Sequence, residues 1–259
     1  MDILLTNDDG IEGTGLRVLY DALSEVGDVL VVAPAEDQSA VGRVRSNEVS
    51  VEERDVGYAL AGTPVDCVIA GLEAIGPYPD LVVAGCNEGA NLGEYVLGRS
   101  GTVSAAVEAA FFGVPAIAVS LYVPVGMGKW SGESEVRSDH YDEAVRATRY
   151  LVEHALGAGV FEQAEYLNVN APMPGDEPAP IEVTRPSRGQ AVTADSDGNG
   201  RITLRDDIWK RMKRGDVDDP PGTDRRAVLD GKVSVSPLTA PHTTEHHEAL
   251  DALAETYPG

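Results

Sequence analysis

Two adjacent acids end the first apolar stretch of the chain, MDILLTNDDG, and their carboxylates could hold a metal ion. Residues 3–6 predict a short buried strand, and Gly10 marks the turn that follows it. Neighbouring side chains on a strand point to opposite faces, so Asp8 and Asp9 can serve one site only if the strand ends before them. The alternative for the two acids is that they cap the next helix.

Oxygen-bearing side chains also follow two later apolar runs that predict strands. Residues 28–34 are followed by AEDQSA, which offers Ser39, and residues 80–85 are followed by CNEGANLG, which offers Asn87 and Asn91. In an open parallel sheet, ligands bind beyond the carboxyl ends of the strands. We therefore expect these side chains to meet the two opening acids at one edge of a sheet.

Two carboxylates, a hydroxyl and an amide carbonyl would make a hard oxygen site without histidine or thiolate. Such a donor set favours Mg²⁺ or Mn²⁺ over zinc. A cation would also keep two neighbouring carboxylates ionised, since like charges otherwise raise the pKa of each other. The predicted ligands of one divalent metal ion are Asp8, Asp9, Ser39 and Asn87.

The segment RSGTVSAAVEAA places Ser100, Gly101 and Thr102 just before a predicted helix. Free backbone amides and the helix dipole favour an anion at such a position, although simple capping by Ser100 or Thr102 is the alternative. Beside a metal, this segment and Asn91 are predicted to bind the phosphate of a substrate. A metal and a phosphate site without a Walker lysine motif suggest phosphoester hydrolysis by a metal-activated water, with Asp8 and Asp9 as catalytic groups.

Strand and helix signals alternate through the first half of the chain. Thr63, Pro64 and Asp66 form an N-terminal capping signature for the second helix. Alternation of this kind implies a parallel sheet covered by helices on both faces, and so a three-layer α/β core. We expect helices over 15–27, 62–76 and 103–112, and further strands over 28–34, 80–85 and 116–123.

The second half is less regular, with a predicted helix over 141–156 and a strand over 166–172. Residues 193–204 and 226–238 resemble hairpin arms around the charged segment IWKRMKRGDVDDPPG. We interpret the chain as one domain, residues 1–259. In it, 1–123 carry the active site and 124–259 complete the core and add irregular C-terminal arms.

The formal net charge is −23, and four of the twenty basic residues are lysine. Such a charge repels nucleic acid and anionic membranes. An acidic, lysine-poor surface suits a cytoplasm of very high salt, where repulsion is screened, and so predicts a halophilic source; a merely acidic mesophilic protein is the alternative.

No apolar run approaches the roughly 18 residues of a membrane span, and no secretory signal opens the chain, so we expect a cytoplasmic protein. Cys67 and Cys86 lie in apolar segments and are predicted to be reduced core thiols.

The ordered motifs of this sequence resemble the SurE (survival protein E) family of metal-dependent nucleotidases. They are NDDG, APAEDQSA, GTPVDCV, GCNEGANLG, SGTV, LNVNAP, TRPSRG and GKVSVSPL. The resemblance covers most of residues 1–123 and recurs at the last three motifs. It implies 5′-nucleotidase activity on nucleoside monophosphates, a Rossmann-like core and a single divalent metal on the four predicted ligands.

The resemblance also implies homodimers or homotetramers with exchanged C-terminal arms. GKVSVSPL (231–238) supports that expectation, because an apolar strand in a polar tail needs a partner. Two residues depart from the family pattern: Arg99 stands where tyrosine usually precedes SGT, and Cys86 replaces an aliphatic residue. Arg99 could contact the phosphate, offset local acidity, or lie on the surface without a role.

Two other functions remain open at this stage. Asp8 or Asp9 could be a covalent nucleophile, as in aspartyl-phosphate phosphatases, although the acids of those enzymes are one residue apart. The chain could also be a nucleotide-sensing module without activity, because fold does not fix function. The base preference and the general acid are not predicted.

Two further motifs have metal-like spacing. Residues 195–206 match an EF-hand calcium loop, but the flanking residues predict strands, and a hairpin turn is the better interpretation. HTTEHH (242–247) could bind a transition metal, although an exposed tail is the simpler interpretation.

Overall fold

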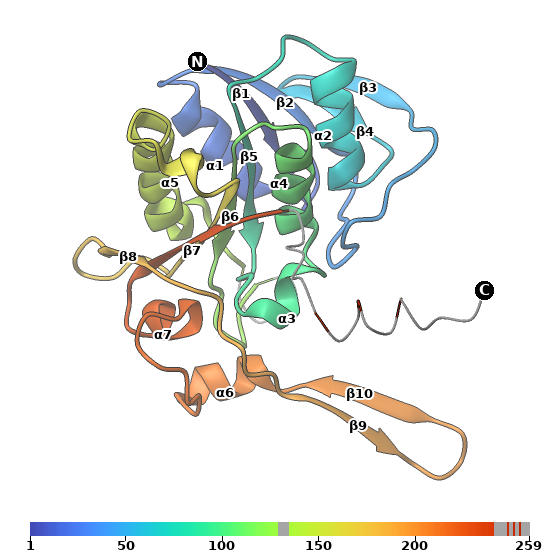
Figure 1. The fold of residues 1–259 in the computed structure, drawn as a ribbon, viewed down its shortest axis with the longest axis vertical. Coiled ribbons are helices and arrows are strands. Elements are labelled where there is room, and N and C mark those ends of the chain that lie inside the picture. The colour runs from blue at the N-terminus through green and yellow to red at the C-terminus, as the bar shows by residue number, and fades with distance from the viewer. Residues whose placement is uncertain (129–134, 241–247, 249–250, 252–253, 255–259) are drawn as a thin grey trace.

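The computed structural model describes residues 1–128, 135–240, 248, 251 and 254. Its main element is a nine-stranded sheet with helices on both sides (Figure 1). In spatial order, the strands of this sheet are β3 (Val51–Arg54), β4 (Gly57–Leu60), β2 (Asp28–Pro34), β1 (Asp2–Thr6), β5 (Leu81–Glu88), β6 (Ala116–Leu121), β7 (Tyr166–Ala171), β11 (Val233–Leu238) and β8 (Ile181–Val183).

The six central strands, from β4 to β7, are all parallel. Ile3 pairs with Val29 of β2 on one side and with Leu81 of β5 on the other, so β1 lies in the middle of the sheet. Within the described part of this sheet, antiparallel pairs occur only toward the two edges, at β3–β4 and at β7–β11. The predicted mainly parallel sheet is therefore confirmed, and its parallel part extends past residue 123 to β7.

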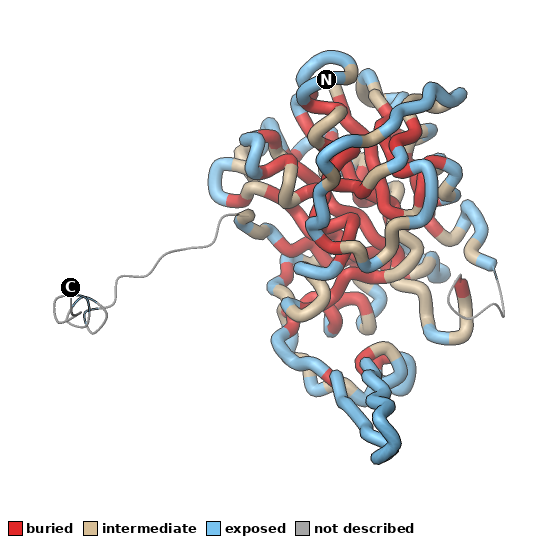
Figure 2. Tube along the Cα trace, turned by 90° about the vertical axis from the view of Figure 1, so that its right-hand side faces the viewer, coloured by how far each residue is buried: buried red, intermediate tan, exposed pale blue. Residues whose placement is uncertain are grey.

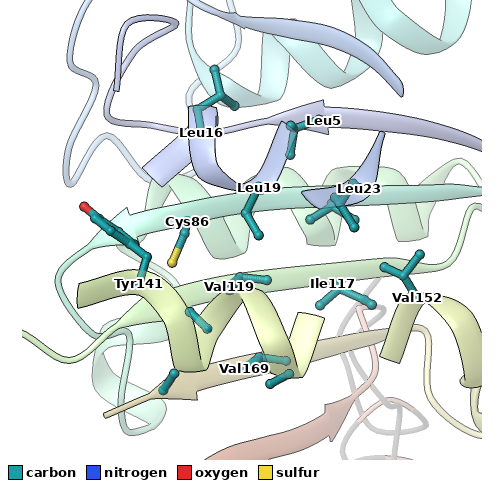
Figure 3. Close-up of a cluster of buried hydrophobic side chains, with 14 of the residues drawn as sticks. Leu5, Leu16, Leu19, Leu23, Cys86, Ile117, Val119, Tyr141, Val152 and Val169 are labelled. Atoms are coloured by element: carbon teal, nitrogen blue, oxygen red, sulfur yellow. The ribbon is translucent and has the colours of Figure 1, made fainter. Parts of the chain in front are cut away.

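Helices cover both faces of the sheet, as predicted for a three-layer core. α1 and α5 pack on one face, where Leu16, Leu19 and Leu23 of α1 meet the strand side chains in one apolar cluster (Figure 3). α2 and α4 pack on the other face in a second cluster. The buried residues gather in this layered part of the chain (Figure 2). The helices are α1 (Thr14–Leu23), α2 (Pro64–Glu73), α3 (Glu94–Leu97), α4 (Gly101–Phe111), α5 (Asp142–His154), α6 (Ile208–Arg214) and α7 (Asp224–Leu229).

The start of α2 follows its predicted capping signature. The Thr63 hydroxyl accepts a hydrogen bond from the Asp66 amide at 3.2 Å, and the Asp66 carboxylate accepts one from the Thr63 amide at 2.9 Å. Pro64 opens the helix, where its missing N–H removes no helical hydrogen bond. Capping of this kind typically contributes about 1 kcal/mol.

The C-terminal third agrees with the prediction in one arm and contradicts it in the other. Residues 193–204 do form a hairpin, β9 (Val192–Ser196) with β10 (Ile202–Asp206), and its ten strand residues are all exposed (Figure 2). The prediction of a second hairpin arm over 226–238 is wrong. That segment forms α7 and then β11, which lies inside the main sheet between β7 and β8.

β11 can lie inside the main sheet because its small polar residues find hydrogen-bond partners there. Ser234 and Ser236 are buried, and both hydroxyls lie 2.8 Å from the Thr184 hydroxyl. Val233 and Val235 point into the apolar core. Both edges of β11 are thus paired within the same chain, and its apolar character gives no reason for a partner subunit.

The structure also settles the EF-hand-like segment. Residues 195–206 belong to the β9–β10 hairpin, and in its turn the Asp197 carboxylate accepts hydrogen bonds from the amides of Asn199 and Arg201. The hairpin interpretation is confirmed. The motif HTTEHH lies outside the described residues. No helix in the described part of the chain is long and apolar enough to cross a membrane.

Candidate active site

A cavity of about 460 Å³ lies beyond the carboxyl ends of the central strands. Side chains that follow β1, β2 and β5 line it, as expected for ligand sites in parallel sheets. Among the predicted site residues, the lining includes Asp8, Ser39, Asn87, Asn91 and Ser100. The structure therefore brings Asp8, Ser39, Asn87 and Asn91, from three separate strand ends, to one cavity, and Ser100 joins them from the start of α4.

Asp8 is 3% exposed, and it is held by the start of α4. β1 ends at Thr6, so the turn aims the Asp8 carboxylate away from the strand. The Thr102 hydroxyl donates to Oδ1 of Asp8 at 2.6 Å, and the Thr102 amide donates to Oδ2 at 3.2 Å. The positive end of the α4 dipole also favours a carboxylate at this place.

The start of α4 can lie this close to Asp8 because residue 101 is a glycine, which has no side chain. A Cβ atom at residue 101 would lie 2.8 Å from Cβ of Asp8 and 2.9 Å from its Oδ2, closer than side-chain atoms pack. The segment 100–102, which was predicted to bind phosphate, holds one of the opening acids in the structure.

Asp9 turns toward the end of β5. Its Oδ2 accepts a hydrogen bond from the Glu88 amide at 2.8 Å, and Glu88 itself lines the cavity. Asp9 is not among the described residues that form the cavity wall. The two adjacent acids therefore reach different partners: Asp8 reaches the α4 side of the site, and Asp9 reaches the β5 side.

The loop after β2 brings Ser39 to the cavity. Two backbone hydrogen bonds fasten this loop, from Gln38 N to Asp8 O at 2.7 Å and from Gly42 N to Arg99 O at 3.1 Å. The Ser39 amide also donates to the Asp37 carboxylate at 2.8 Å. Ser39 is therefore fixed relative to the backbone of the first acid.

Asn87 lies at the end of β5, just past a register shift against β6. Its Nδ2 donates to the Gly89 carbonyl, which orients the amide so that Oδ1 is the end able to act as a ligand. The preceding residue, Cys86, is fully buried, and burial together with the charge of Asp9 raises the pKa of its thiol well above the usual value. Cys67 and Cys86 are free and buried, as predicted.

Two residues of the predicted phosphate set are already engaged within the protein. The Ser100 hydroxyl caps α4 by accepting from the Val103 amide at 3.0 Å. The Asn91 Nδ2 donates to the Ser120 hydroxyl at 2.9 Å, and the Asn91 carbonyl accepts from the side chains of Asn168 and Asn170. Both residues still line the cavity, so they shape its wall as well as bind within the protein.

Arg99 is the one basic residue among the described residues that line the cavity. Its guanidinium lies 3.9 Å from the centre of the Tyr95 ring and donates to the Tyr95 carbonyl at 2.6 Å. It faces a wall that also carries the carboxylates of Asp8, Glu88 and Asp206. The departure from the family pattern thus lies in the cavity rather than on a remote surface.

Other lining residues were missed by the sequence reasoning. The loop 123–128 follows β6, so the rule that pointed to Ser39 and Asn87 would have found it as well. Tyr95, Asp206 and Trp209 carry no such signal, because they come from the short helix α3 and from the segment around α6.

No cluster of three or more His, Cys, Asp or Glu side chains able to hold a metal ion occurs among the described residues. The predicted donor set has two carboxylates, a hydroxyl and an amide oxygen, and it is of the kind that Mg²⁺ and Mn²⁺ accept with waters. Three of the four donors line the cavity, and the fourth, Asp9, binds the amide of a lining residue. The residues present therefore fit a hard divalent cation.

Comparisons with known proteins identify the family. The family described as "Survival protein SurE" matches residues 3–193. The chain is 66% identical over 255 residues to the 5′-nucleotidase SurE of Haloarcula marismortui, covering 98% of this chain and 94% of that protein. It is 61% identical over 258 residues to the 5′-nucleotidase SurE of Natronomonas pharaonis, covering 99% and 100%.

A solved structure agrees with these relatives. The crystal structure of the SurE protein from Aquifex aeolicus matches with a TM-score of 0.78 at 32% identity, over 99% of this chain and 98% of that one. The two named relatives come from halophilic archaea, in agreement with the acidic, lysine-poor composition. The chain belongs to the SurE family.

Proposed function

We propose that this protein is a 5′-nucleotidase that hydrolyses nucleoside monophosphates to nucleoside and phosphate. The observation that carries the proposal is the meeting of Asp8, Ser39 and Asn87, from three neighbouring strand ends, at one cavity. The volume of about 460 Å³ lies in the range of small-molecule sites. Relatives that match nearly the full chain carry the name 5′-nucleotidase SurE.

The proposed activity uses one divalent cation per subunit, Mg²⁺ or Mn²⁺, held by Asp8, Asp9, Ser39 and Asn87. A bound cation of this kind supplies a low-pKa water as nucleophile and neutralises charge on the phosphoryl oxygens. The donor chemistry supports the assignment, because each of the four residues offers a hard oxygen.

The protein supplies positioning and charge. Thr102 fixes both carboxylate oxygens of Asp8, and Glu88 fixes one oxygen of Asp9. Preorganised groups of this kind need no reorganisation during the reaction, which lowers the barrier. Arg99 offers the positive charge that a phosphate dianion needs beside so many carboxylates. Asn91 and the segment 100–102 complete the part of the site that binds the phosphate.

The test is turnover of AMP in molar KCl with Mn²⁺, followed as released phosphate, and then with an excess of EDTA. We expect release that depends on Mn²⁺ and stops with EDTA. Nucleotide binding without turnover would support the sensing module instead. A phosphoryl-enzyme trapped on Asp8 or Asp9 would support the aspartyl-phosphate mechanism.

We also propose that the protein acts in the cytoplasm as a homodimer or homotetramer with exchanged C-terminal arms. Residues 231–238 were expected to support this assembly, but their strand β11 lies inside the sheet. The exposed β9–β10 hairpin supports it instead. Its side chains include Ile202 and Leu204, which are 65% and 74% exposed. Light scattering in molar KCl would contradict the assembly if it gave only the 27.3 kDa monomer.

A further inference from the structure

Part of the cavity lining is apolar or aromatic, and we call this part the aromatic wall; the lining around Asp8 is instead rich in oxygen atoms. The aromatic wall is formed by Tyr95 of α3, by the loop 123–128 after β6, and by Trp209 of α6. These elements come from distant parts of the sequence and converge on the same cavity. A ligand that suits both walls has an anionic end and a flat, apolar end.

Trp209 is anchored by its own helix. α6 buries Ile208 and Met212, and the partly buried Trp209 packs on a small cluster that contains Ala90, Leu92 and Met212. Ala90 directly follows the glycine turn at the end of β5 and itself lines the cavity. Trp209 therefore packs against the segment that follows Asn87 in the chain.

A hydrogen bond joins α6 to the loop 123–128. Lys213 of α6 donates from Nζ to the carbonyl of Val125 at 2.6 Å. Just before α6 begins, the Asp207 amide donates a hydrogen bond to the Ala191 carbonyl at 3.1 Å. These contacts hold the helix against the loop, so the aromatic wall is built into the fold rather than formed by a loose side chain.

We infer that Trp209 forms the nucleobase subsite of the proposed nucleotidase and stacks on the base of the substrate. Aromatic side chains stack on any base, since every base has a π-face. The inference rests on the proposed function for its substrate class, and it names the residue that distinguishes a nucleotide from a simple sugar phosphate.

The first test compares AMP with ribose 5-phosphate, which has the same phosphate and sugar but no base. Trp209→Ala should raise the KM for AMP about 10-fold, while the kcat/KM for ribose 5-phosphate stays within about 2-fold. Trp209→Phe should restore most of the affinity for AMP. Lys210→Ala, on the same helix and exposed, is the matched control and should change neither substrate.

Equal losses for both substrates in Trp209→Ala, or no loss for AMP, would overturn the inference. The first outcome would make Trp209 a structural residue of the cavity wall. The second would place the base elsewhere. Thermal melts of each variant show whether α6 still folds, and the Phe variant keeps the test valid if the Ala variant does not.

A second readout does not depend on catalysis. The chain has two tryptophans, so Trp130→Phe leaves Trp209 as the only indole. Adenosine, which has no phosphate, should quench the fluorescence of this variant saturably, and ribose 5-phosphate should not. Quenching without turnover of AMP would uphold the subsite and contradict the proposed function, whereas turnover of AMP without quenching would contradict the subsite alone.

Discussion

Two buried aspartates, Asp8 and Asp224, accept hydrogen bonds from backbone amides, and they differ in what lies beside them. Asp8 is 3% exposed, binds the amide and hydroxyl of Thr102, and lines the cavity. Asp224, at the start of α7, is 0% exposed and is not among the described residues that line the cavity.

Asp224 is enclosed by four donors. It accepts hydrogen bonds from the amides of Gly93, Ser187 and Arg225 and from the Ser187 hydroxyl, at 2.7–2.9 Å. It thereby ties the loop after β5 to the segment 184–189 and to α7. Burial and hydrogen bonding alone do not distinguish the two carboxylates. The difference is the adjacent cavity, so we expect Asp8 to act in function and Asp224 in stability.

The largest expected effect is a loss of activity when either of the opening acids, Asp8 or Asp9, is replaced. Asp8→Asn and Asp9→Asn should each lower kcat about 100-fold or more, because an amide lacks the charge that holds a cation. The melting temperature should change much less than the activity, because relief of repulsion between the two adjacent carboxylates in the metal-free protein opposes the loss of the hydrogen bond from the Thr102 amide to Asp8. Full activity in both variants would show that the acids cap structure only, as would a stability loss of about 1 kcal/mol without loss of activity.

The next effect is on stability at Asp224. Asp224→Asn should lower the free energy of unfolding by about 2–3 kcal/mol, because an amide cannot accept from four donors and hydrogen bonds to a charged group are the strong ones. Urea unfolding in molar KCl measures it, and exposed Asp218→Asn is the control. The kcat per folded molecule should change only a few-fold. A 100-fold loss of kcat at unchanged stability would erase the contrast with Asp8.

Thr102 sharpens the comparison, because its hydroxyl and amide both donate to Asp8 while Thr102 is not among the described residues that line the cavity. Thr102→Val removes the hydroxyl that donates at 2.6 Å and should lower kcat about 10-fold through misplacement of the carboxylate. Thr102→Ser keeps the hydroxyl and should recover most of the rate. If Ser behaved as Val does, the loss would come from packing at this fully buried position instead.

The smallest effects are expected at the neutral ligands. Ser39→Ala and Asn87→Ala remove an oxygen but no charge, so the Mn²⁺ concentration for half-maximal activity should rise several-fold. Saturating Mn²⁺ should restore most of the rate, unlike in the aspartate variants. A kcat that stays low at every Mn²⁺ concentration would mean that these residues act on the substrate rather than on the metal.

Local signals in the sequence predicted much of the core. The apolar run 28–34 became β2 with the same bounds, and Thr63 and Asp66 capped α2 as their spacing indicated. The strand-end rule also brought Asp8, Ser39 and Asn87 together. These features depend on neighbouring residues or on the common geometry of parallel sheets.

The remaining features depend on contacts between distant segments. β11 was predicted as part of a hairpin arm because nothing local indicates that it lies between β7 and β8, about 65 and 50 residues earlier in the chain. Trp209 lies in a charged segment, and only the folded α6 turns it toward the cavity. The bond from Thr102 to Asp8 likewise joins residues 94 positions apart.

Direct counting of bound Mn²⁺ tests the central claim, that Asp8 belongs to a cation site and Asp224 does not. Electron paramagnetic resonance of free Mn²⁺ gives the number of ions bound per chain for wild type, Asp8→Asn and Asp224→Asn in molar KCl. We predict one ion per chain in the wild type and in folded Asp224→Asn, and at least a 10-fold weaker affinity in Asp8→Asn. Wild-type affinity in Asp8→Asn would contradict the account.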